Sequence, residues 1–249
     1  MCTTLTFSTH KSLYTNTHTH CSVVPAIKFY LTQPGAERLE LVLIPSPADA
    51  HLEPVFPQWP MPREDIPEDD EDGLKFFKRV TLLPNPATFV IGDMVWGAST
   101  VDVAFHLNPE VASRAPPPAP GSKPPDRYSQ LAAHLLQQRS YYPLYPGASP
   151  EAGGGGGVPL EVSRLRGAGM PCSPDVLLLP SRVGLPCARV VGGGTVAVNA
   201  GSLARLKSYA KVAVFPMGAG AMDAAEAVGA THVWNGAPAR VRVDLERLA

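Results

Sequence analysis

The sequence predicts a mixed α/β sandwich in which most helices are inserted between strands. Short apolar runs closed by turn residues, which favour strands, occur in the first part of the chain and throughout its last part. Between these regions lie two stretches whose apolar residues recur at helical spacing. The chain also has 28 prolines and 22 glycines in 249 residues, so part of it is predicted to be linker.

The first ordered elements are predicted to be strands. Residues Leu39–Pro45 form a short apolar run closed by proline, which predicts a buried strand. A proline-punctuated, extended segment follows and ends in the acidic run Glu64–Asp72, which is typical of a solvated loop. The next two apolar runs flank Gly92-Asp93, a pair that favours a two-residue turn. The sequence therefore predicts a β-hairpin around this pair.

Two helices and two insertions are predicted next. Thr100 is expected to cap a short helix over residues 101–107, and Asp126 is expected to cap a helix of about three turns. The proline-rich residues 108–125 and the low-complexity residues 147–157 are predicted to be flexible insertions. The apolar faces of the two helices are defined by Val101 and Phe105 in the first and by Tyr128, Leu131 and Leu135 in the second.

The last part of the chain is predicted to be rich in strands. Gly192-Gly193-Gly194-Thr195 lacks the lysine and the helix of a phosphate-binding loop, so it predicts a turn between strands. The predicted strands are Asp175–Leu179, Thr195–Val198, Ser208–Phe215 and Ala239–Leu245.

One short motif raises the question of a metal site. Asp49-Ala50-His51 has the Asp-x-His spacing with which a carboxylate and an imidazole share a metal in two-metal phosphoesterases. Each metal takes roughly four to six donors, so further His, Asn and Asp residues are needed at other strand ends. The sequence contains no Gly-Asn-His, Gly-His-x-His or Gly-Asp-x-x-Asp. No metal or other cofactor is therefore predicted, and the isolated His106 and His134 are expected to be packed or surface residues.

Composition narrows the environment and the partners. With 21 basic and 22 acidic residues the formal charge is −1, so any nucleic-acid contact has to be local or made by a partner. No apolar run reaches the roughly 18 residues of a membrane span, and no membrane association is predicted. The cysteines form no C-x-x-C pair, which predicts reduced thiols in a cytosolic or nuclear protein. They are Cys2, Cys21, Cys172 and Cys187.

Four of the segments predicted to be ordered also carry a family resemblance. They read LVLIPSPADAHLEPVFPQ, FVIGDMVWGASTVDVAFHL, LLQQRSYYPLYP, and PDVLLLPSR followed by VAVNAGSLAR. In order and approximate spacing they resemble the C-terminal domain of the B-subunit family of DNA polymerase alpha. RSYYPLYP is the most specific, because it differs from the corresponding part of the delta and epsilon polymerase B subunits. The resemblance covers roughly residues 39–217; residues 1–38 are expected to be disordered or unrelated to the family, and 39–249 to form a partial domain.

The resemblance implies a calcineurin-like metallophosphoesterase fold, an αββα sandwich that is inactive and here incomplete at its N-terminal side. Pro45-Ser46-Pro47-Ala48-Asp49 resembles the turn where active relatives carry Gly-Asn-His-Asp, and Pro180-Ser181-Arg182 the turn where they carry Gly-His-x-His. Asn199-Ala200-Gly201-Ser202 resembles the Asn-Pro-Gly-Ser turn that follows. In active relatives the first Asp-x-His and Gly-Asp motifs lie on earlier strands, which have no counterpart here. Asp49-Ala50-His51 lies after the wrong strand to replace them. No catalytic residue is therefore expected.

By the same resemblance, the chain is expected to be a nuclear accessory subunit without catalytic activity. The family binds the zinc-containing C-terminal region of the polymerase catalytic subunit, tethers it to primase and supports initiation of DNA synthesis, so DNA is expected to be contacted through the complex. Aromatic side chains supply much interface energy. Tyr141, Tyr142, Leu144 and Tyr145 are therefore the candidate partner interface, and the alternative is that their rings pack into the domain's own core.

Three other functions are less consistent with the sequence. A B subunit of another replicative polymerase, of the delta or epsilon type, is disfavoured by RSYYPLYP. An active metallophosphoesterase is disfavoured by the missing ligands. A nucleic-acid-binding module predicts a basic, aromatic-lined groove, but the arginines are scattered and the run Glu64–Asp72 repels phosphates.

Overall fold

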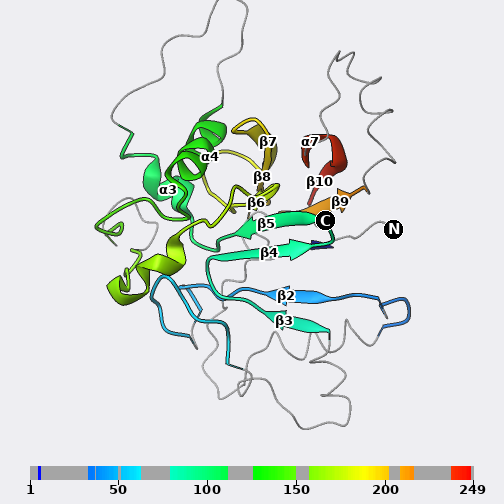
Figure 1. Ribbon diagram of the computed structural model, residues 1–249, viewed down its shortest axis with the longest axis horizontal. Coiled ribbons are helices and arrows are strands. Elements are labelled where there is room, and N and C mark those ends of the chain that lie inside the picture. The colour runs from blue at the N-terminus through cyan, green and yellow to red at the C-terminus, as the bar shows by residue number, and fades with distance from the viewer. Residues whose placement is uncertain are drawn as a thin grey trace, which may run out of the picture.

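A mixed five-stranded sheet lies at the centre of the chain (Figure 1). The computed structural model describes residues 5–6, 33–36, 38–49, 52–62, 79–111, 126–149, 157–201, 208–215 and 237–247. In the order β4-β5-β6-β8-β7, the three inner strands run parallel, and each outer strand is antiparallel to its neighbour. The strands are β4 (Ala87–Ile91), β5 (Met94–Ala98), β6 (Val176–Leu178), β8 (Thr195–Asn199) and β7 (Cys187–Val191).

Two smaller sheets accompany the central one. An antiparallel sheet has the order β1-β9-β10, and a parallel pair joins β2 to β3. Their strands are β1 (Leu5–Thr6), β9 (Ser208–Val214) and β10 (Val241–Arg247) in the first, and β2 (Leu41–Leu43) and β3 (Val80–Leu82) in the second.

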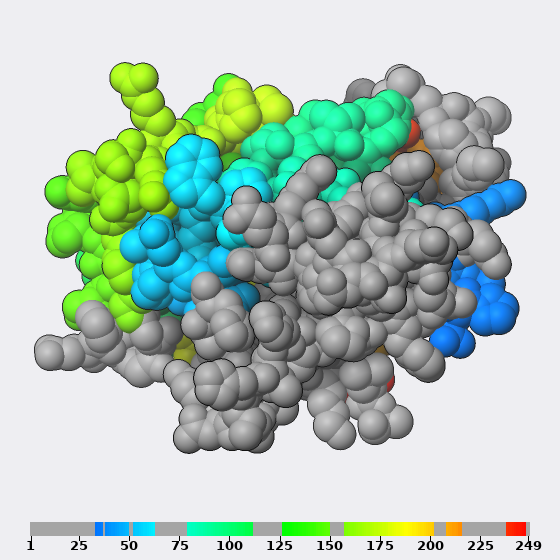
Figure 2. All heavy atoms as spheres, turned by 90° about the horizontal axis from the view of Figure 1, so that it is seen from below, coloured from blue at the N-terminus to red at the C-terminus, as the bar shows by residue number. Residues whose placement is uncertain are grey.

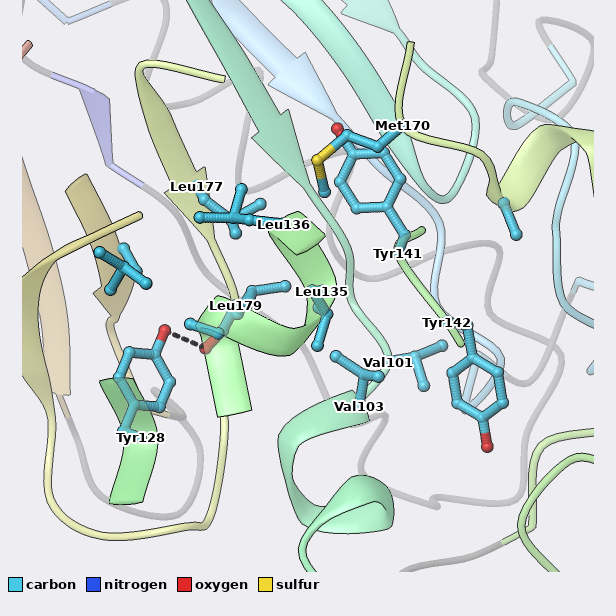
Figure 3. Close-up of a cluster of buried hydrophobic side chains, with 14 of the residues drawn as sticks. Val101, Val103, Tyr128, Leu135, Leu136, Tyr141, Tyr142, Met170, Leu177 and Leu179 are labelled. Carbon is cyan, nitrogen blue, oxygen red and sulfur yellow. Dashed lines mark hydrogen bonds between the residues drawn. The ribbon is translucent and has the colours of Figure 1, made fainter. Parts of the chain in front are cut away.

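Helices lie against one face of the central sheet. They are α3 (Val103–Leu107), α4 (Arg127–Gln138) and the 3₁₀ helix η2 (Val162–Ala168). A further short helix, α7 (Ala237–Arg240), directly precedes β10 and is not part of this group. Leu177 and Ala197 of the sheet share one apolar cluster with the buried Leu135 and Leu136 of α4 (Figure 3). No described helix is long and apolar enough to cross a membrane.

The opposite face of the central sheet is covered by β9 and β10. Trp96, Val176 and Val198 are buried on the central sheet and pack in a second cluster with Ala210 and Val212 of β9. Alternation of side chains across each strand places one set of residues in each cluster. The described residues therefore form three layers, with helices, the central sheet and the smaller antiparallel sheet in that order.

The predicted hairpin and the predicted glycine turn are both confirmed. Gly92-Asp93 joins β4 to β5, and Gly92 takes the positive φ of +64° that this turn requires. Gly192–Gly194 joins β7 to β8. β7 itself is absent from the predicted strands, because it lies at the sheet edge and exposes Arg189 and Val190.

The longer helix is confirmed, whereas the cap of the shorter one was wrong. Asp126 caps α4 through a 2.8 Å hydrogen bond that its carboxylate accepts from the Ser129 amide. The cap of α3 is Asp102, not Thr100, because the Thr100 hydroxyl instead donates to the Pro45 carbonyl oxygen at 2.7 Å. Phe105 consequently lies on the partly exposed side of α3, whose buried residues are Val103, Ala104 and His106.

Other strand predictions need adjustment or fall outside the described residues. β2 is only half-buried, because it pairs with a single strand and is not in the central sheet. Ala239 and Arg240 belong to α7, so the last strand begins at Val241. Outside the described residues lie the run Glu64–Asp72, His51, most of 1–38, and residues 112–125 and 150–156 of the predicted insertions.

The extended segment 52–62 lies along the outside of the domain (Figure 2). Its Phe56 amide donates to the Pro159 carbonyl at 2.9 Å, and its Phe56 carbonyl accepts from the Glu161 amide at 2.9 Å. The Phe56 side chain is fully buried, and its ring centroid lies 5.6 Å from that of Tyr142. Segment 52–62 is thereby fixed to η2 and to the helix-side core.

Candidate functional site

The turns that follow β5, β6 and β8 meet at one edge of the central sheet. These strands are parallel, so their carboxyl ends lie together, which is where open α/β sheets commonly bind ligands. We call residues 99–102, 180–182 and 199–201 the strand-end edge. Its Ser99, Ser181 and Asn199 side chains are all buried. This edge is the place to look for any catalytic or metal-binding arrangement.

Asn199 holds two of these turns together. Its Oδ1 accepts hydrogen bonds from the Ser181 and Gly201 amides, both at 2.9 Å, and its Nδ2 donates to the Ser181 carbonyl at 3.1 Å. Both the oxygen and the nitrogen of this buried side-chain amide are hydrogen-bonded to backbone, so its role is to hold the two turns together. Its oxygen is already occupied by two backbone donors, so Asn199 is poorly placed to ligate a metal.

Asp102 is the principal charged group at the strand-end edge. Its Oδ1 accepts from the Phe105 amide at 3.1 Å, and its Oδ2 accepts from the Arg182 amide at 2.9 Å and from Arg182 Nε at 3.3 Å. The Arg182 guanidinium also lies over the Phe105 ring, with its carbon 4.6 Å from the ring centroid. The carboxylate thus caps α3 and joins it to the turn after β6.

The turn after β2 lies beside the same edge. The Thr100 hydroxyl bonds the Pro45 carbonyl, and the Thr100 amide donates to Asn85 Oδ1 at 3.1 Å. Within that turn the Asp49 amide donates to the Ser46 carbonyl at 2.9 Å. The structure therefore brings both turns predicted to be degenerate metal sites, Pro45–Asp49 and Pro180–Arg182, next to residues 99–102.

Neither turn is part of a set of metal-binding side chains in the described residues. No group of three or more His, Cys, Asp or Glu side chains that could hold a metal occurs in that part of the chain. Asp93 lies in the β4–β5 hairpin, and its carboxylate accepts a 2.7 Å hydrogen bond from Arg240. This hydrogen bond lowers the pKa of Asp93.

The four aromatic and apolar residues of the candidate interface divide into two groups. Tyr141 and Tyr142 are 1% and 5% exposed, and Leu144 is partly buried against the same core, whereas Tyr145 is 75% exposed. Figure 3 shows the Tyr141 ring beside Met170 and the Tyr142 ring further along the chain. The inward-packing alternative therefore holds for the first two tyrosines, and the interface prediction rests on Tyr145 and the exposed part of Leu144.

Hydrogen bonds explain why the two tyrosines face inward. The Tyr141 hydroxyl lies 2.6 Å from Thr88 Oγ1 and donates to the Ala87 carbonyl at 3.2 Å. Burial raises the pKa of Tyr141 to about 12, so the hydroxyl stays neutral. The Tyr142 hydroxyl accepts from the Ala148 amide at 3.0 Å. Each buried hydroxyl thus has a partner, as buried polar groups require.

Sequence reasoning missed Asp102 altogether. The signal was present, because Asp is as good an N-cap as Thr and stands directly before the helical run. The choice between Thr100 and Asp102 depends on a distant contact, because the Thr100 hydroxyl donates to the Pro45 carbonyl oxygen, 55 residues away in the chain.

The three layers define a mixed α/β domain, and its described residues contain no group of three or more His, Cys, Asp or Glu side chains that could hold a metal. The chain belongs to the family of DNA polymerase alpha/epsilon B subunits, whose model matches residues 5–184. The resemblance seen in the sequence is thereby confirmed at the level of the family, and the match begins upstream of residue 39.

Individual relatives agree with this assignment. The chain is 36% identical to the DNA polymerase alpha B subunit of Bos taurus over 143 residues, which are 57% of this chain and 21% of the relative. It is 32% identical to that of Mus musculus over 165 residues, 66% and 24% of the two chains. It is 30% identical to that of Schizosaccharomyces pombe over 188 residues, 71% and 28%. The chain thus spans about a quarter of the length of these relatives.

Proposed function

We propose that this chain is part of a non-catalytic accessory subunit of DNA polymerase alpha–primase, which scaffolds the catalytic subunit and primase for initiation of replication. The observation that carries the proposal is that the polar side chains of the strand-end edge are already hydrogen-bonded within the protein. Asn199 and Asp102, the side chains there that would suit a metal, are committed to backbone and arginine partners. Relatives named as polymerase alpha B subunits support the assignment to this complex.

We further propose that the domain is a degenerate calcineurin-like phosphoesterase of the αββα type. Two facing sheets with helices on one outer side support this, as does the meeting of Pro45–Asp49 and Pro180–Arg182 at one edge. In this proposal Ser46, Pro47, Ala48, Asp49, Pro180, Ser181 and Arg182 occupy the turns that once carried metal ligands.

The proposed partner is the zinc-containing C-terminal region of the polymerase catalytic subunit, with primase and DNA reached through the complex in the nucleus. Tyr145 supports a direct contact, since it is a large, exposed aromatic side chain beside Leu144. Such residues commonly dominate interface energies. Tyr141 and Tyr142 would then position the segment from inside the core.

Catalysis and partner binding are tested separately. Purified chain is mixed with Mn²⁺ or Zn²⁺ and an aryl phosphate, and we expect no saturable turnover. Metal-dependent turnover that Asp102→Asn or Asp49→Asn abolishes would contradict the non-catalytic proposal.

The partner contact is tested by measuring the affinity for the C-terminal region of the catalytic subunit. Tyr145→Ala is expected to weaken binding by about 2 kcal/mol, roughly thirtyfold, without a change in Tm. Leu185→Ala is the control, because Leu185 is 70% exposed in the loop between β6 and β7. Equal affinities of wild type and Tyr145→Ala would remove Tyr145 from the interface.

A further inference from the structure

A pocket of about 470 Å³, open to solvent, lies beside the beginning of β4, and none of its lining residues belongs to the strand-end edge. Its volume is within the range of ligand pockets in proteins. Thr88 and Tyr141 are the uncharged polar residues of its lining, Met170 and Pro171 are apolar members, and Arg139 and Arg166 are the two basic residues. Two positive charges beside an apolar surface favour an anionic ligand that also carries apolar groups.

The two arginines stand on segments that are fixed to each other. The Tyr141 amide donates to the Ala168 carbonyl at 2.8 Å, and the Met170 amide donates to the Arg139 carbonyl at 2.7 Å. Both segments are anchored by buried side chains, since Tyr141 and Met170 are 1% and 3% exposed and lie side by side in Figure 3. The backbone that presents the two charges is therefore preorganised, which lowers the cost of ligand binding.

Neither arginine is paired with a carboxylate in the described part of the chain. Arg139 donates only long hydrogen bonds to neutral oxygens, at 3.3 and 3.4 Å. The guanidinium of Arg166 has no acceptor among the described residues. Arg164, two positions earlier, shows the contrast, since it pairs with Glu53 at 3.3 Å. Two unneutralised guanidinium groups on one pocket can each bind a carboxylate with two hydrogen bonds.

The backbone at Arg139 gives an independent reason to look for a role of its side chain. Arg139 ends α4 with a φ of +52°, the left-handed conformation that glycine or asparagine usually occupies. An unfavourable conformation at a pocket is a reason to suspect function. Glycine in its place would relieve the backbone and remove the charge, which makes Arg139→Gly an informative variant.

We propose that this pocket binds an acidic segment of a protein partner, in which carboxylates alternate with apolar residues. A protein carboxylate is favoured over a nucleic-acid phosphate, because a phosphate backbone needs a track of many cations and the chain has a net charge of −1. Pro86, Met170 and Pro171 are the apolar residues of the lining, and Pro171 is the exposed one among them. The proposal goes beyond the scaffold function and stands whether or not the partner is a polymerase subunit.

The test uses the whole 249-residue chain and three fluorescent probes: a blocked octapeptide of alternating Asp and Leu, the same peptide with Asn for Asp, and a twelve-nucleotide oligothymidylate. Fluorescence anisotropy at low salt gives each Kd. We expect the Asp peptide to bind at least tenfold more tightly than the other two probes, since two charge-assisted hydrogen-bonded pairs are lost with Asn.

Two arginine variants and one control assign that binding to the pocket. Arg166→Gln and Arg139→Gly are each expected to weaken binding of the Asp peptide about tenfold. The Tm of Arg139→Gly is expected to be equal to or above that of wild type. Arg247→Gln removes the same charge from an exposed residue at the end of β10 and is expected to leave the Kd within twofold of wild type.

Three results would overturn the proposal. The first is failure of the Asp peptide to bind below about 1 mM. The second is binding that neither pocket variant weakens more than Arg247→Gln does. The third is tighter binding of the oligothymidylate that both pocket variants weaken, which would make the pocket a phosphate site.

Discussion

Tyr141 and Gly97 fit closely against each other in the core. Gly97 faces the Tyr141 hydroxyl, and a Cβ atom on Gly97 would lie 2.5 Å from that oxygen. The hydroxyl is held from its other side by Thr88 and the Ala87 carbonyl. Glycine at position 97 is thus required by the side chain of a residue that is distant in the sequence.

This fit predicts a coupled pair of substitutions. Gly97→Ala is expected to destabilise the fold by about 1–3 kcal/mol through overpacking, and Tyr141→Phe by about 1 kcal/mol through the lost hydroxyl bonds. In the double variant the clashing oxygen is absent, so the total loss is expected to be smaller than the sum of the two. Urea denaturation of the four proteins measures the difference, and strict additivity would show that the contact is unimportant.

At the scale of a single element, α4 shows how one carboxylate can begin a helix and also join it to the sheet. Asp126 accepts the Ser129 amide, as an N-cap does, and pairs with Arg189 of β7. Burial raises the pKa of Asp126, but the hydrogen bonds from Ser129 and Arg189 outweigh this and lower it overall. The folded pKa therefore lies below the unfolded one. Asp126 stabilises the fold above the unfolded pKa, and this is lost as the pH falls through the folded pKa.

Two substitutions separate the cap from the charge. Asp126→Ala is expected to cost about 1 kcal/mol at pH 7, because the cap is lost. Asp126→Asn keeps an oxygen for the Ser129 amide and is expected to cost less, since the exposed pair with Arg189 contributes at most about 1 kcal/mol. The difference in the free energy of unfolding between wild type and Asp126→Asn should become smaller as the pH falls below about 4. A difference that is the same at pH 7 and pH 3, measured by urea denaturation, would contradict the assignment.

At the scale of the whole molecule, the described fold depends on two apolar interfaces, one on each face of the central sheet. The helix side is built from α4 and the buried tyrosines, and the other side from β9 and β10. Ala210 and Val212 of β9 are fully buried, although β9 lies outside the central sheet. The small sheet is therefore held to the central one by side-chain packing.

This packing predicts a large effect from one β9 residue. Val212→Ala is expected to destabilise the fold by about 2 kcal/mol, through lost burial and the cavity left behind. Val190→Ala makes the same change on β7, where the side chain is 59% exposed, and is expected to change stability by less than about 0.5 kcal/mol. Thermal unfolding compares the two. Equal Tm values would mean that β9 contributes little to the fold.

Features decided by neighbouring residues could be predicted from the sequence alone. The hairpin at Gly92-Asp93, the turn at Gly192–Gly194 and the Asp126-capped helix each depend on interactions within a few residues. The family could also be identified, because its segments keep their order along the chain. Local conformational preference and sequence order are properties that the sequence carries without knowledge of the fold.

Features decided by distant residues emerged only from the tertiary structure. Tyr141, Tyr142 and Tyr145 share one short aromatic segment, yet the first two are buried and the third is exposed. Tyr141 turns inward because its hydroxyl bonds Thr88, 53 residues away. Asp102 replaces Thr100 as a helix cap because the Thr100 hydroxyl donates to the Pro45 carbonyl oxygen, 55 residues away. Such contacts exist only once the strands are ordered in the sheet, and no local pattern in the sequence encodes that order.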